Sequence, residues 1–212
     1  MKLTKYEHAC FTVEKDGKLL VVDPGGWTTD LPALESVVAV VVTHEHPDHF
    51  DVNALGAIIS HNPDARIYAH ENITRQFGDT LPATAVVAGE GIEAGPFKLE
   101  FYGGEHATIH PDLAVVANLG VMINGKIYYP GDSFVQPDRP VDVLALPTTA
   151  PWLKISEVFD FLTAVKPRLA FPTHDAISSD VGKQLPDRMV PMFAEKAGTT
   201  YQRLHEPIEI NE

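Results

Sequence analysis

The sequence is poor in cysteine, in positive charge and in long apolar runs. Its single cysteine, Cys10, excludes an intrachain disulfide and fits a reducing cytoplasm, where we expect a buried thiol. Sixteen Lys and Arg residues stand against 29 Asp and Glu residues, and the resulting net charge of −13 repels polyanions such as nucleic acids. Because no segment approaches the ~18 apolar residues of a transmembrane helix, we expect a cytoplasmic protein without membrane insertion.

The rest of the composition is that of an ordinary globular protein. Hydrophobic residues make up 44% of the chain and charged residues 21%, which excludes a disordered or fibrous protein. With 212 residues the chain is long enough to bury a sizeable core, and we expect one domain spanning residues 1–212.

Short apolar runs separated by turn residues predict a layered α/β fold. We expect strands over residues 19–22, 37–42, 66–69, 97–102, 113–123, 126–129, 141–146 and 168–171. Apolar residues at helical spacing predict helices over 51–59 and over 155–165, the second with Ser156 as a candidate N-cap. A last helix should end at Gly198, with a break or kink at Pro186 and Pro191. The hairpin signal Asn124-Gly125 implies antiparallel pairing, which disfavours a purely parallel sheet.

The densest cluster of chemically active side chains lies in residues 43–49, directly after the run 37–42. Three imidazoles and a carboxylate occur within six residues: His44, His46, Asp48 and His49. In an extended loop, residues two apart project to the same side, and Pro47 forces a turn before the last two. Imidazole and carboxylate suit Zn²⁺ and neighbouring first-row metals, and the absence of nearby cysteine disfavours a structural cysteine-type zinc site. The loop can therefore serve two adjacent metal ions.

Three further candidate ligands follow other predicted strands. His106 follows 97–102, Asp132 follows 126–129 and His174 follows 168–171. Ligands of layered α/β proteins converge at one end of the sheet, so we expect these side chains to meet the loop 43–49. His110 competes with His106 for the middle position, and we favour His106 because it lies nearer the end of its strand. Trp27 and Trp152 follow strand ends at the same edge, where they either wall a pocket or pack internally.

The order of these motifs along nearly the whole chain resembles the metallo-β-lactamase fold superfamily. The resemblance implies a four-layer αββα sandwich that carries two metal ions. One ion would be held by His44, His46 and His106, the other by Asp48, His49 and His174, with Asp132 as the bridge. Asp23, in the segment Val21-Val22-Asp23-Pro24-Gly25, would support the histidine loop from behind.

Residues 8–13 and the pair Leu146-Pro147 resemble the compact branch of that superfamily. This branch includes ascorbate-6-phosphate lactonase, N-acylphosphatidylethanolamine phospholipase D and other metal-dependent hydrolases. By this resemblance His8 would lie near the metal site, as a support for a ligand or as a substrate contact. His61, His70 and His205 are expected to be ordinary surface residues.

The resemblance implies a dinuclear metal-dependent hydrolase. Two divalent cations, with zinc as the first expectation and manganese as the second, would share a water molecule and lower its pKa toward ~7. The resulting hydroxide would attack a carbonyl or phosphorus centre. Asp132 would position the two cations, and Asp48 could orient the nucleophile. The branch points to a small-molecule substrate with an ester, lactone or phosphodiester bond.

Two other functions stay open on the residues alone. Mononuclear-iron oxidoreductases use the same fold, and the ligands do not name the metal. A non-catalytic metal-binding protein would keep the ligands for stability, although seven candidates exceed the four ligands of a closed structural zinc site. The oligomeric state does not follow from the sequence.

Overall fold

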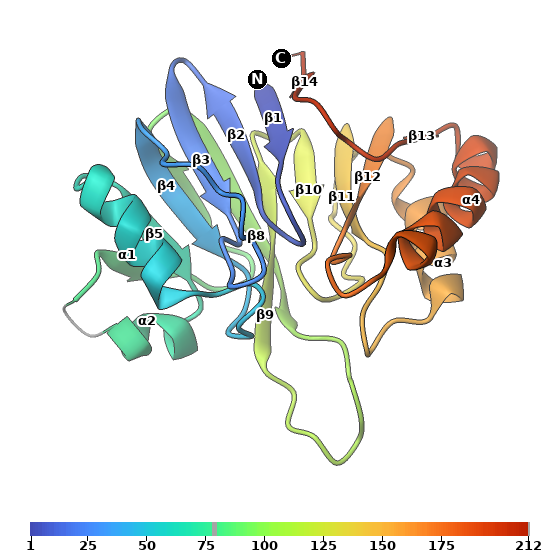
Figure 1. Ribbon diagram of the computed structural model, residues 1–212, viewed down its shortest axis with the longest axis horizontal. Coiled ribbons are helices and arrows are strands. Elements are labelled where there is room, and N and C mark those ends of the chain that lie inside the picture. Colours follow the sequence, from blue (N-terminus) through green and yellow to red (C-terminus); the bar gives the residue numbers. More distant parts are fainter. Residues whose placement is uncertain (78–79, 212) are drawn as a thin grey trace.

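The computed structural model describes residues 1–77 and 80–211, which form two seven-stranded sheets packed face to face (Figure 1). The first sheet contains, in spatial order, β14 (Ile208–Glu209), β1 (Lys2–Lys5), β2 (Phe11–Lys15), β3 (Lys18–Val22), β4 (Val37–Val42), β5 (Arg66–Ala69) and β6 (Ala83–Ala85). The second contains β13 (Thr200–Tyr201), β12 (Leu169–Thr173), β11 (Val143–Pro147), β10 (Ile127–Tyr129), β9 (Ala117–Ile123), β8 (Phe97–Glu105) and β7 (Gly91–Ala94).

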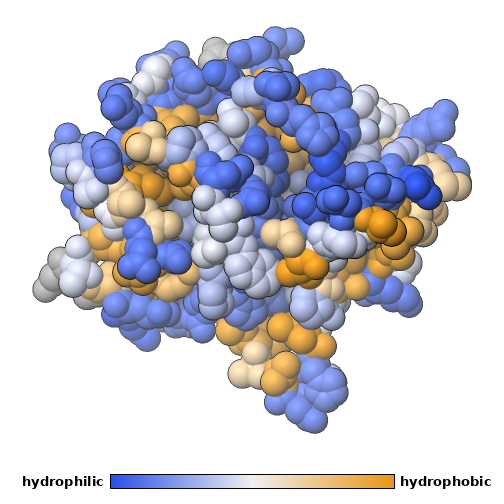
Figure 2. Space-filling view, in the orientation of Figure 1, coloured by the Kyte–Doolittle hydropathy of each residue, from blue (hydrophilic) through white to orange (hydrophobic). Residues whose placement is uncertain are grey.

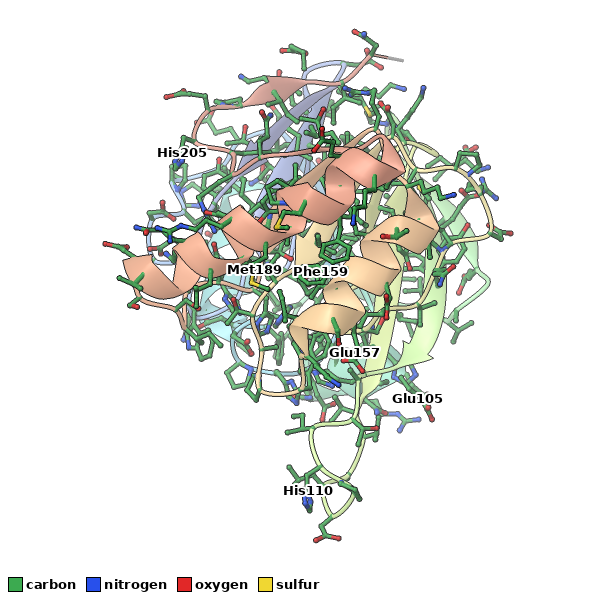
Figure 3. The ribbon with its side chains drawn as sticks, turned by 90° about the vertical axis from the view of Figure 1, so that its right-hand side faces the viewer. Glu105, His110, Glu157, Phe159, Met189 and His205 are labelled. Atoms are coloured by element: carbon green, nitrogen blue, oxygen red, sulfur yellow. The ribbon has the colours of Figure 1, made fainter. Side chains whose placement is uncertain are left out.

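Helices cover the outer face of each sheet, which completes the expected four layers. The helices α1 (Val52–His61) and α2 (Glu71–Phe77) lie against the first sheet, and α3 (Ile155–Val165) and α4 (Asp180–Ala197) against the second (Figure 1). In Figure 3, α3 and α4 run side by side in front of the second sheet, and the rings of Phe159 and Phe193 stack between them at 4.1 Å. The αββα prediction is confirmed.

Strand β4 shows why an unbroken run of β-branched residues suits this architecture. Ala39 and Val41 belong to the core between the sheets, whereas Val40 and Val42 belong to the core beneath α1 and α2. Successive side chains of a strand point to opposite faces, so a strand buried on both faces must be apolar at every position. Burial on both faces holds β4 in place, and residues 43–49 follow directly after this strand.

Both sheets are mixed, as the hairpin signal predicted. Strands β3 to β6 pair in parallel, as do β10 to β13, while the remaining neighbours pair antiparallel. Asn124 and Gly125 lie in the tight turn between β9 and β10 and have φ angles of 51° and 63°, the left-handed values that Asn and Gly adopt most readily in such turns. The buried Cys10 is also confirmed, and burial raises the pKa of its thiol to about 12.

Three local predictions were wrong. Residues 113–116 are not part of β9 but of a loop that projects from the lower edge of the molecule in Figure 1, where Leu113 and Val115 stay exposed and have no sheet partner. Figure 2 shows apolar side chains on this projection near the body and hydrophilic ones at its tip. Lys154, not Ser156, is the N-cap of α3.

The third correction concerns the last helix, in which the expected break is absent: α4 continues from Asp180 through both prolines to its predicted C-cap at Gly198. Pro186 is buried on the same helix face as Val190 and Ala194, so burial offsets the backbone hydrogen bonds that proline cannot make. Within residues 1–77 and 80–211, no helix is both long enough and apolar enough to span a membrane.

Candidate metal centre

The structure gathers the seven predicted ligands at one edge of the two sheets. Residues 43–49 follow β4 of the first sheet, and the other three ligands follow β8, β10 and β12 of the second. A bridge between His44 and Asn118 of β9 joins the two sheets here. We refer to His44, His46, Asp48, His49, His106, Asp132 and His174 together as the candidate metal centre.

Four buried atoms of this centre have no hydrogen-bond partner: Nε2 of His49, Nε2 of His106, Oδ1 of Asp132 and Nε2 of His174. They face one another. Asp132 Oδ1 lies 3.4 Å from His49 Nε2, while Asp132 Oδ2 lies 3.0 Å from His174 Nε2 and 3.3 Å from His106 Nε2. Buried polar atoms are normally paired, and imidazole nitrogens beside carboxylate oxygens are the donor set of divalent first-row cations. The residues therefore fit a metal site.

The ligand atoms fall into three overlapping groups in which all atoms lie within 4.8 Å of one another. The groups are His44, His46 and His106; then His8, Asp48, His49 and His174; then His44, His49 and Asp132. The first two reproduce the two sets implied by the superfamily resemblance, with His8 added. The third places Asp132 beside one histidine from each set, as a bridging carboxylate requires.

The outer nitrogen of each buried ring has its own partner. Nδ1 of His49 lies 2.7 Å from Asp23 Oδ2, Nδ1 of His106 lies 2.5 Å from the Ala107 carbonyl, and Nδ1 of His174 lies 2.6 Å from the Thr149 carbonyl. These acceptors require a proton on Nδ1, so each ring, in its neutral form, directs the Nε2 lone pair into the centre. The orientation of the rings is thus set from outside.

Asp23 holds the histidine loop from behind, as the resemblance implied. Its Oδ1 accepts from the Thr43 backbone at 2.8 Å, and its Oδ2 accepts from the Thr43 hydroxyl at 2.7 Å as well as from His49. The next turn must also lie close to the loop, because a Cβ on Gly25 would sit 1.9 Å from the carbonyl oxygen of Asp48. Only glycine fits that position without moving the loop.

Both ring nitrogens of His8 have hydrogen-bond partners, and one of these partners is Asp48. The backbone N–H of Ala176 donates to His8 Nδ1 at 3.3 Å, so the proton lies on Nε2, which donates to Asp48 Oδ2 at 2.9 Å. Burial lowers the pKa of His8 to about 4, so the ring is neutral. The arrangement makes His8 a support for Asp48 rather than a ligand of its own.

The charges of the centre compensate one another through shared protons. Burial alone would lower the pKa of His174, but the carboxylates of Asp132 and Asp48, 3.0 and 3.2 Å from its Nε2, outweigh that effect and raise the pKa to about 10 while no cation is bound. Burial alone would raise the pKa of Asp132, but the nearby rings of His49, His106 and His174 hold that pKa well below its usual range. Two ionised carboxylates among buried imidazoles are stabilised by nearby positive charge. Bound cations would provide that charge in place of protons on the histidines.

The remaining histidines lie outside the centre. His110 is exposed at the tip of the projecting loop, whereas Glu105 lies at its base (Figure 3), so the choice of His106 over His110 agrees with the structure. His61 and His205 are exposed and His70 is half-buried, and none of the three belongs to a ligand group of the described residues.

Two residues that hold Asp132 were not identified as its partners from the sequence. Asn118, the second residue of β9, accepts from the Asp132 backbone N–H at 2.9 Å and donates to the Pro130 carbonyl at 2.9 Å. Trp152 donates from its indole Nε1 to Asp132 Oδ2 at 2.9 Å. The loop position of Trp152 could suggest a site residue, but nothing in the pattern identified its partner.

Comparison with known proteins places this fold and site in a family. Residues 2–174 match the β-lactamase superfamily domain, and the chain belongs to that family, with the metallo-β-lactamase type of sandwich. Protein Rv0786c of Mycobacterium tuberculosis is 37% identical over 182 residues, which cover 84% of this chain and 85% of that protein.

Two further comparisons agree. A UPF0173 metal-dependent hydrolase of Aeropyrum pernix is 30% identical over 156 residues, which cover 65% of this chain and 63% of that protein. The solved structure of Igni18, a metallo hydrolase from Ignicoccus hospitalis, aligns with a TM-score of 0.73 at 20% identity and covers 99% of each chain. At that identity the structural match speaks for the fold alone.

Proposed function

We propose that this protein is a hydrolase that depends on two divalent cations. His44, His46 and His106 would hold one cation, Asp48, His49 and His174 the other, and Asp132 would lie between them. The observation that carries the proposal is the set of unpartnered buried atoms on His49, His106, Asp132 and His174, which face one another. The relative from Aeropyrum pernix, named a metal-dependent hydrolase, supports the same reading.

When bound, such cations supply Lewis acidity and make a water molecule nucleophilic near neutral pH. Zinc or manganese suits the imidazole and carboxylate donors. The one cysteine lies in a hydrophobic cluster beneath α1 and α2, so it adds no thiolate to this donor set. The alternative of a mononuclear-iron oxidoreductase would use fewer of these donors.

The two carboxylates have different exposures and therefore different tasks. The Asp48 side chain is 12% exposed, whereas the Asp132 side chain is 3% exposed. Asp48 is thus the carboxylate that an attacking water molecule reaches, and His8 keeps it oriented by donating to Oδ2. Asp132 lies deeper among the rings, where its charge offsets that of the cations. We assign nucleophile orientation to Asp48 and charge compensation to Asp132.

The substrate we propose is a small ester, lactone or phosphodiester, with an anionic ester first. The overall charge of −13 opposes long polyanions, whereas two divalent cations would leave the centre locally positive. Activated water attacks carbonyl and phosphorus centres alike, so the centre itself does not select between these bonds.

A substrate screen tests the proposal. Small lactones, aryl esters and bis-aryl phosphodiesters would be compared with structured RNA and single-stranded DNA, each with Zn²⁺ or Mn²⁺. We expect cation-dependent hydrolysis of a small substrate. Efficient cleavage of nucleic acid with no turnover of the small esters would contradict the substrate class. Iron in the purified protein together with oxygen consumption would favour the oxidoreductase, and cation binding without any turnover would favour a non-catalytic role.

A further inference from the structure

Trp152 makes an unusual contact for an aromatic residue at the border of a buried cluster. It is half-buried in the segment between β11 and α3, and its indole Nε1 donates to Asp132 Oδ2 at 2.9 Å. The ring packs edge to face against Phe134, with centroids 5.2 Å apart, and against His106 at 5.9 Å. Trp152 therefore links one strand end of the second sheet to candidate ligands from two others.

The backbone of Asp132 is already fixed on both sides. Its N–H donates to Asn118 Oδ1 at 2.9 Å, and its carbonyl accepts from the N–H of Ala107 at 2.8 Å. Asp132 also follows Gly131, whose φ of 64° and close approach to Asn118 leave no room for a side chain. The freedom that remains is rotation of the Asp132 side chain about its own torsions.

The neighbouring histidines cannot restrain that rotation once they are neutral. His106 and His174 both lie near Asp132 Oδ2, but each uses its Nδ1 proton on a backbone carbonyl. Neutral imidazole is the form that binds cations, and its Nε2 then carries a lone pair instead of a proton. Among residues 1–77 and 80–211, Trp152 is then the one hydrogen-bond donor found for the Asp132 carboxylate.

We propose that Trp152 is a positioning residue that orients the bridging carboxylate of Asp132 through its indole N–H. This inference rests on the proposed cation-binding function of the centre. The N–H occupies one lone pair of Oδ2, which fixes the plane of the carboxylate. The buried, unpartnered Oδ1 and the remainder of Oδ2 would then stay available to hold cations. Partners of metal ligands typically contribute 10–100-fold to metal affinity.

The test compares two matched tryptophan variants, since the chain contains two tryptophans. Trp152→Phe keeps an aromatic ring against Phe134 and His106 but removes the N–H. Trp27→Phe is the control, because Trp27 is exposed, packs against the ring of His8 at 4.8 Å, and its indole N–H makes no hydrogen bond within residues 1–77 and 80–211. Zn²⁺ and Mn²⁺ affinities would be measured by competition with a chromophoric chelator, together with thermal unfolding of each variant without cations.

We expect Trp152→Phe to lower the affinity for at least one cation about 10–100-fold, with little change in the cation-free melting temperature. Trp27→Phe should stay within about threefold of the parent, which is well below that range. Equal cation affinities for Trp152→Phe and the parent would overturn the proposal. A drop in melting temperature without a drop in affinity would also overturn it, because that pattern belongs to a packing role.

The indole N–H itself provides a second reading that needs no turnover. In ¹H–¹⁵N spectra, Trp27→Phe assigns the Trp152 indole signal, which should exchange slowly with solvent and shift strongly in Asp132→Ala. A Trp152 indole signal with the same chemical shift in Asp132→Ala as in the parent protein would refute the contact. If the parent protein binds cations but hydrolyses nothing, the hydrolase proposal fails, and the cation affinities of the variants still test the role of Trp152. If the parent protein binds no cation, both proposals fail.

Discussion

The two halves of the candidate metal centre are built in different ways. His44, His46, Asp48 and His49 come from one loop of six residues after β4. His106, Asp132 and His174 come from three strand ends, one residue each. The first half is arranged mainly by the local chain together with Asp23, whereas the second exists only when β8, β10 and β12 are correctly placed in their sheet.

The difference shows in the groups that hold each half. Asp23 supports the loop from the neighbouring strand end, through Thr43 and His49. The separate ligands are held by contacts between distant segments: Ala107 donates to the Asp132 carbonyl, and the His174 backbone N–H donates to the carbonyl of His8. A change in the first half should therefore act on one loop, while a change in the second half should act on the junction between loops.

Removal of the cations should have the largest effect. Chelation should abolish hydrolysis, and it should also lower the melting temperature, because a cation present at 1,000 times its dissociation constant stabilises the folded state by about 4 kcal/mol. Hydrogen exchange should increase more around His106, Asp132 and His174 than in the loop that Asp23 holds. Activity that survives complete chelation would refute the cation requirement.

Asp132→Asn changes one candidate ligand of the second half directly. Asn has nearly the same shape, but it lacks the negative charge between the rings, so one cation should become labile while the fold persists. We expect a loss of activity larger than the roughly 100-fold that loss of a ligand's outer partner can cost. Metal content after dialysis and circular dichroism check both parts. Full cation content with full activity would rule out a bridging role.

Asp23→Asn removes the carboxylate that supports the loop of the first half. An amide cannot accept all the hydrogen bonds that Thr43 and His49 now donate to the carboxylate, so a buried donor is left unpaired, at about 1–3 kcal/mol. Cation affinity should fall about 10–100-fold. Denaturant unfolding and chelator competition measure the two effects.

Asn62→Ala is the matched control for Asp23→Asn. Asn62 is also buried and also ties β4 to its surroundings, but at the opposite end of the strand, through hydrogen bonds with Val37 and Leu34. It should lose similar stability with no loss of cation affinity. Equal affinity losses in the two variants would mean that general destabilisation, not the support of the loop, explains the effect.

Two glycines give the last comparison, in which Gly56 has the smallest expected effect of all. A Cβ on Gly25 would meet the backbone of Asp48 and His49, so Gly25→Ala should destabilise the fold by about 1–3 kcal/mol and displace the loop. Gly56, within α1, has nothing within 4 Å of the added Cβ, and Gly56→Ala should stabilise by about 0.5–1 kcal/mol. Thermal melts compare them, and a harmless Gly25→Ala would contradict the close approach.

The same comparison explains what the sequence could reveal. The loop 43–49 was recognisable because its residues are adjacent, and β4 was predicted with its observed bounds because both of its faces are buried. His106, Asp132 and His174 could be selected only through the family resemblance and their places after strands. The structure brings these residues together, and their binding of metal stays a prediction.

Other features depend on contacts between distant segments and left no local pattern. Nothing near Asn118 or Trp152 in the chain indicates Asp132 as their partner. The continuous helix α4 also could not be predicted from local sequence preferences, because burial of Pro186 outweighs the preference of proline to end a helix. Leu113 and Val115 have strand-like composition, but they lie on a loop with no neighbouring strand.

The central claim is that the two halves together hold two cations, and the direct measurement is the number of cations per chain. Protein purified without chelators would be titrated with Zn²⁺ and with Mn²⁺, freed of loose metal and examined by elemental analysis. The account predicts close to two cations per chain in the parent protein. A value that stays at one under excess of either metal would contradict the dinuclear centre.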